Sequence, residues 1–121
     1  MINIKPIIYK ELKNIAGNVS DTFPQEETNF PAIMYLEERN EPYEIVDDGE
    51  SKSSIAYKVD IWDTKSTSNT AVEVDKVFSK LGLFRKSSID IPEPGGLRHK
   101  QMRFEGIVDL DNMLVYQNRY E

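Results

Sequence analysis

The 121-residue sequence predicts an α+β fold, a two-layer sandwich in which two helices pack on one face of a mainly antiparallel sheet. Two stretches repeat apolar residues at helical spacing, and five others have strand-like composition, in the order helix-strand-strand-strand-helix-strand-strand. The composition, 39% hydrophobic and 30% charged, is that of a globular chain. We therefore expect a single domain over residues 1–121, with a core in residues 1–110 and a tail or short extra strand in residues 111–121.

The first helix is expected over residues 3–16. Pro6 fits its first turn, where a missing N–H costs nothing. Gly17 and Asn18 form a stop signal, because both residues tolerate the left-handed conformation. The apolar stripe of this helix consists of Ile4, Ile8, Leu12 and Ile15.

Three strands are expected before the second helix. Residues 19–23 form a short candidate, and residues 32–38 form an apolar run that suggests cover on both faces. The polar, acidic residues 40–53 suggest a long hairpin connection. Residues 54–63 then alternate clearly, with Lys58 and Asp60 on one face. The opposite face carries Ile55, Tyr57, Val59 and Ile61.

A Ser/Thr/Asn cluster at residues 64–69 is expected to cap the second helix. Thr70 and Glu73 have the spacing of a capping box, with Ser66 and Ser68 as rival caps. Gly82 is expected to end the helix. The apolar stripe of this second helix consists of Ala71, Val74, Phe78 and Leu81.

Two more strands are expected after this helix, over residues 83–91 and 98–109, joined by a turn at residues 92–96. In the last strand the period of two places alternate residues on opposite faces. One face carries Lys100, Met102, Phe104, Gly106 and Val108, and the other carries His99, Gln101, Arg103 and Glu105.

Composition excludes several classes of protein. The chain has no cysteine, so it forms no disulfide or thiolate metal site, which suits a reducing compartment. No apolar run approaches the roughly 18 residues that span a membrane, and the first residues lack a signal-peptide pattern. We therefore expect a cytoplasmic protein. The net charge of −6 argues against a surface that grips nucleic acid.

The sequence predicts no catalytic, cofactor or metal site, and hence no enzyme. His99 is the one histidine and has no evident partner for acid–base chemistry or metal binding. Asp109 and Asp111 could offer two carboxylates to a hard cation, but such cations need about six oxygens. Residues 47–50 resemble a calcium loop in composition only, and none of the common nucleotide-binding or hydrolase motifs is present.

Partner contacts are instead expected at the acidic connection and the tail, because long loops are often functional. A solvated hairpin is the alternative. Trp62 is either packed under the second helix or an exposed anchor. The candidate interface residues are Glu41, Glu44, Asp47, Asp48, Glu50, Trp62, Tyr116 and Tyr120.

Several short sequence segments, in this order, resemble segments of the tail-completion or tail-terminator proteins of tailed phages and prophages. The resemblance covers roughly residues 1–109, and no segment is specific alone. The segments are the opening Met1-Ile2-Asn3-Ile4 with Gly17, then Phe30-Pro31-Ala32-Ile33, Tyr57-Lys58-Val59-Asp60-Ile61-Trp62, Val74-Asp75-Lys76-Val77, Leu81-Gly82-Leu83-Phe84 and Lys100-Gln101-Met102-Arg103-Phe104.

The resemblance implies a structural virion protein without chemistry. It implies a homo-oligomeric ring, commonly a hexamer, that contacts the major tail tube protein and the head–tail connector protein while DNA passes through. The chain would then lie in the bacterial cytoplasm during assembly and in the virion tail or neck afterwards. Two alternatives stay open at this point: a small cytoplasmic adaptor or regulatory domain, and a metal-dependent hydrolase that uses Asp109 and Asp111.

Overall fold

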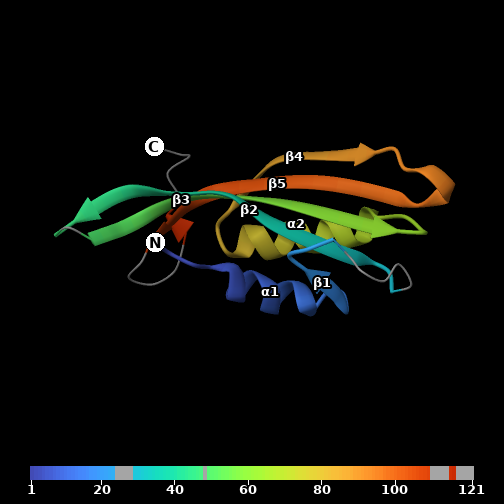
Figure 1. The fold of residues 1–121 in the computed structure, drawn as a ribbon, viewed down its shortest axis with the longest axis horizontal. Helices are drawn as coiled ribbons and strands as arrows, with labels where there is room; N and C mark the ends of the chain where they lie inside the picture. The colour runs from blue at the N-terminus through green and yellow to red at the C-terminus, as the bar shows by residue number, and fades with distance from the viewer. Residues whose placement is uncertain (24–28, 48, 110–114, 117–121) are drawn as a thin grey trace.

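One six-stranded sheet carries both helices on the same face, as the sequence predicts (Figure 1). The computed structural model describes residues 1–23, 29–47, 49–109 and 115–116. A short 3₁₀ turn at Pro94–Gly96 joins the fourth and fifth strands. The other elements are α1 (Lys5–Lys13), β1 (Asn18–Ser20), β2 (Ala32–Val46), β3 (Gly49–Asp63), α2 (Ser68–Lys80), β4 (Phe84–Ile91), β5 (Arg98–Asp109) and β6 (Val115–Tyr116).

The strands lie in the order β1-β2-β3-β5-β4, and β6 also pairs with β5. Only β1 and β2 are parallel, so the sheet is mainly antiparallel, as expected. β3 pairs with β5 from Lys52 and Asp109 to Asp63 and Arg98. Because β3 occupies one whole side of β5, both β4 and β6 lie along its other side.

The core fills the space between the sheet and the two helices. Phe78 of α2 stacks on Phe104 of β5 with the ring centroids 4.2 Å apart, and its ring also contacts Tyr57. The Tyr57 hydroxyl donates to Glu37 at 2.8 Å. Burial, followed by this hydrogen bond, raises the pKa of Tyr57, so the phenol stays a neutral donor. Other core side chains are Ile8, Leu12, Ile33, Ile55, Val59, Ile61, Val74 and Met102.

α1 begins two residues later and ends three residues earlier than the predicted range 3–16. Pro6 lies in its first turn, and the helix stops at Lys13 rather than at residue 16. The N–H groups of Asn14 and Ile15 donate to the carbonyls three residues earlier, which tightens the last turn. None of the described helices is long and apolar enough to cross a membrane.

The predicted capping box of α2 does not form. The helix begins at Ser68 with Thr67 as its N-cap, two residues before Thr70, and the Thr67 side chain makes no capping hydrogen bond. Ser66 Oγ instead accepts from the Ser68 N–H at 3.2 Å. Because the chain is already helical at Thr70, that side chain has no open N–H ahead of it to cap.

The predicted stop at Gly82 is confirmed. Gly82 has a φ of 89°, and its N–H donates to the Ser79 carbonyl at 2.8 Å. The Leu83 N–H donates to the Phe78 carbonyl at 2.9 Å. These two bonds form a Schellman motif, which needs a left-handed residue at this position.

The prediction of a long loop over residues 40–53 is wrong. β2 and β3 stay paired as far as Val46 and Gly49, and only a tight turn separates them. Lys52 Nζ lies 2.9 Å from Glu44 across the two strands. We call residues 41–47 and 49–52 the ribbon end. Figure 1 shows that it projects past both helices.

Replacing Gly82 by alanine tests the helix stop. A side chain in the left-handed region costs about 1–2 kcal/mol, so Gly82→Ala should lower the free energy of unfolding by that amount. Gly17→Ala is the matched control, since no atom would lie within 4 Å of its new Cβ. Urea unfolding of both variants is the measurement, and equal stabilities would contradict the assignment.

Candidate functional site

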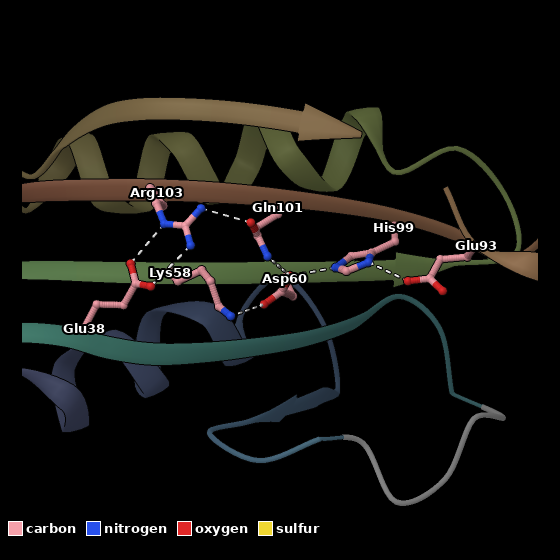
Figure 2. Close-up of polar contacts among 7 residues, drawn as sticks. All are labelled: Glu38, Lys58, Asp60, Glu93, His99, Gln101 and Arg103. Atoms are coloured by element: carbon pink, nitrogen blue, oxygen red, sulfur yellow. Dashed lines mark hydrogen bonds and ion pairs between the residues drawn. The ribbon is translucent and has the colours of Figure 1, made fainter. Parts of the chain in front are cut away.

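A chain of polar side chains crosses the sheet face that carries no helix (Figure 2). We call this face the outer face. Asp60 of β3 is only 2% exposed there, although no helix covers it. Its cover comes from neighbours on the same face, including Trp62 and the paired β5 residues His99 and Gln101. A charge removed from water in this way needs hydrogen-bonding partners.

His99 joins two carboxylates. Its Nε2 lies 2.6 Å from Asp60 Oδ1, and its Nδ1 lies 2.8 Å from Glu93 Oε1. The imidazole also stacks on Trp62, with the ring centroids 4.5 Å apart and the planes 22° apart. The three contacts fix the ring and tie the turn that carries Glu93 to the middle of the sheet.

The row of polar side chains continues across β5 to β2. Gln101 donates to Asp60 Oδ1 at 3.1 Å, and Arg103 donates to Gln101 at 3.0 Å and to Glu38 at 3.1 Å. Lys58 Nζ lies 3.8 Å from Asp60 Oδ2, which makes an ion pair. This distance is too long for a hydrogen bond, and Asp60 Oδ2 has no hydrogen-bond partner among the described residues.

This geometry corrects the expectation that His99 lacks companions, yet it does not create an open reactive site. Both ring nitrogens are already engaged by carboxylate oxygens, so in this arrangement neither is open to a further ligand. Within the described ranges, no group of three or more histidine and acidic residues is placed to hold a metal ion.

A shallow groove of about 450 Å³ lies beside His99, between the start of α2 and the β4–β5 turn. Thr67, which is buried, and the more exposed Ser66 and Ser68 contribute to its wall. Arg98 supplies positive charge and Glu93 negative charge. Asp90 is a second acid in the lining, and it is paired with Lys100.

The ribbon end is the second unusual surface. Tyr43, Ile45 and Val46 are 52%, 65% and 53% exposed. Residues 41–50 also contain five acidic residues and no basic one. Exposed apolar side chains close together on a projecting element are typical of a surface that contacts a partner.

Two acids of the ribbon end are held by local hydrogen bonds. Lys52 and then Ser51 lower the pKa of Glu44, with contacts of 2.9 and 2.8 Å. The Ser53 hydroxyl donates to Glu50 and lowers its pKa. These bonds stabilise the paired strands without covering the apolar side chains.

The structure brings together some of the predicted interface residues. Glu41, Glu44, Asp47 and Glu50 all lie at the ribbon end, where Asp47 has a φ of 53°. Tyr116 lies in β6 beside Ile107 of β5. Asp48, Asp111 and Tyr120 lie outside the described residues.

Trp62 is separate from this group. It lies at the other end of β3, on the outer face, so the expectation that it packs under the second helix is wrong. It is half-buried between His99 and Phe23, whose ring centroid is 6.2 Å away. The alternative, that Trp62 is an exposed anchor for a partner, stays a prediction.

Sequence reasoning missed the apolar residues of the ribbon end and the two carboxylates beside His99. Tyr43 and Ile45 alternate with polar residues, and that period of two is the signal that favours a strand over a loop. Asp60 carries no such signal, because it lies 39 residues from His99 in the chain.

No protein-family model matches the chain. A search of curated proteins also finds no match.

Asp60→Ala should lower the free energy of unfolding by about 3 kcal/mol, because it leaves buried donors on His99 and Gln101 without an acceptor. Asp90→Ala is the control. Asp90 is mostly exposed and pairs with Lys100 at 2.9 Å, so its loss should change stability by no more than about 0.5 kcal/mol. Urea unfolding compares the two, and an equally mild effect at both positions would refute a structural role for the polar chain.

Acid should loosen the ribbon end. The pKa values of Glu44 and Glu50 are lowered from 4.5 by folding. Their stabilising contribution is therefore complete above pH 4.5 and is lost as the pH falls through the lowered values. Amide protection factors in the ribbon end, corrected for intrinsic exchange, should drop between pH 6 and pH 3. The double variant Glu44→Gln, Glu50→Gln should reduce that drop, and an undiminished drop in this variant would contradict the explanation.

Proposed function

We propose that the chain is a structural subunit that assembles with copies of itself into a ring and completes a phage or prophage tail where the tail joins the head. The observation that carries this proposal is the ribbon end, with three large apolar side chains exposed on strands that run beyond the helices. A subunit that works through assembly needs such a surface, whereas a catalyst needs convergent reactive groups.

The cost of exposing these side chains supports a partner. Burying a Tyr, Ile or Val side chain is worth about 1.5–3 kcal/mol. The single subunit forgoes part of that gain for Tyr43, Ile45 and Val46, which are 52–65% exposed. A neighbouring subunit that covers the ribbon end would recover it.

The charge of the chain also suits a position around a DNA channel. The net charge is −6, and the ribbon end contributes four acids, Glu41, Glu44, Asp47 and Glu50. Negative charge near the channel repels the phosphate backbone, so DNA passes without being held. The major tail tube protein and the head–tail connector protein are the further partners that the resemblance to tail-completion proteins implies.

Self-assembly is tested by replacing apolar residues of the ribbon end. The wild-type protein should form closed rings at high concentration, visible by electron microscopy and measurable by sedimentation. Ile45→Ser with Val46→Ser should raise the concentration needed for half-assembly at least about ten-fold.

Tyr9→Ser is the matched control, because Tyr9 is an exposed aromatic residue on α1, away from the ribbon end. It should assemble as the wild type does. A wild-type protein that stays monomeric at about millimolar concentration would contradict self-assembly.

The assignment to a phage tail has a separate test in the neighbourhood of the gene. Genes for a portal protein, head–tail adaptors and a major tail protein should flank it. A neighbourhood of metabolic or regulatory genes would overturn the tail assignment and favour an adaptor domain.

A further inference from the structure

We propose that the ribbon end of one copy docks against β4 of a second copy of this chain. The proposal rests on the self-assembly proposed above and names the two surfaces that meet. The ribbon end is acidic and apolar, and β4 is the edge strand of the sheet.

β4 offers an open strand edge. It is the terminal strand in the order β1-β2-β3-β5-β4, and no other described strand pairs with its far side. An open edge presents unpaired N–H and C=O groups to an approaching strand. β2 is also unpaired on one side beyond Met34, where its pairing with β1 ends. Both elements can therefore extend a sheet across a subunit boundary.

The β4 side has apolar surface to match the ribbon end. Ile89 of β4 is 50% exposed, and Val72 of α2 is 54% exposed. A groove of about 280 Å³ lies on the other, helix-bearing face, between α2 and β4, where Ala71, Val72 and Met102 line it together with Ser68, Asp75, Arg85, Ser88 and Lys100. Ile89 lies on the outer face, because it pairs with Gln101, so it is the apolar residue of the β4 edge that can cover Ile45 of the ribbon end.

The charges of the two surfaces are opposite where β4 begins. Arg85 and Lys86 pair only loosely within the subunit, with Asp75 at 3.4 Å and Glu105 at 3.7 Å. Glu41 of the ribbon end makes no ion pair among the described residues. Asp90 near the far end of β4 is paired with Lys100. Such complementarity fixes register and partner choice more than it adds affinity.

One copy cannot make this contact with itself. β3 and β5 separate β2 from β4 in the sheet, and the ribbon end projects away from β4 (Figure 1). The contact joins two different patches, so each copy has one patch left for the next neighbour. A contact of this kind closes into a ring when the rotation between subunits allows it.

Disulfide trapping tests the contact, because the chain contains no cysteine. Ile45→Cys protein is mixed with Ile89→Cys protein under mild oxidation, and the mixed dimer is followed over time. The 45–89 disulfide should form at least about ten-fold faster than the disulfide between Ile45→Cys and the control Tyr9→Cys, because docking raises the local thiol concentration. Equal rates would overturn the docking proposal.

Charge reversal gives a second readout. Glu41→Lys in the Ile45→Cys protein, or Lys86→Glu in the Ile89→Cys protein, should slow trapping about two- to five-fold. Combining the two reversals should restore the rate. A combination as slow as the singles would rule out pairing between these surface charges.

Failure of the docking proposal can be distinguished from failure of the self-assembly proposal. Rings of wild-type protein without preferential 45–89 trapping would leave self-assembly standing and remove the docking proposal. A specific 45–89 dimer in a protein whose double-cysteine variant never closes into rings would support the contact and contradict the ring. Absence of both would remove both proposals.

Discussion

The structure depends on one constraint: both helices bury the same face of the sheet. Phe78 inserts between them and the strands, where it stacks on Phe104 at 4.2 Å and contacts Tyr57. This packing consumes the apolar stripes of α1 and α2, so no helix is left to cover the outer face or the ends of the long strands. The polar outer face follows from this placement of the helices, whereas the open edge of β4 follows from the strand order.

Hydrogen bonds between side chains, and not a second apolar layer, hold the side chains of the outer face in position. Asp60, His99 and Glu93 form its centre, and Gln101 and Arg103 extend it toward β2. Both ring nitrogens of His99 are engaged within this network. The polar chain links β2, β3 and β5 to the turn that carries Glu93.

The parts of the fold with a local signal could be predicted from sequence. The alternation in residues 55–61 and 99–105 assigns β3 and β5 to their faces, and Gly82 marks a helix end because only a left-handed residue fits there. The ribbon end has a mixed signal, since Pro42 and four acids suggest a loop while Tyr43 and Ile45 favour a strand. Cross-strand pairing with residues 49–52 decided the outcome, and pairing is not encoded locally. The same applies to Asp60 and His99, which meet only because β3 and β5 align in register.

We propose that neighbouring subunits cover the rim of the sheet, and above all the ribbon end. Hydrogen–deuterium exchange of the wild-type protein, compared between dilute and concentrated solution, tests it most directly. The account predicts that amides of residues 41–52 become slower to exchange in the concentrated, assembled protein, while α1 is unchanged. Assembly that protects α1 and leaves residues 41–52 as fast as in the dilute protein would contradict it.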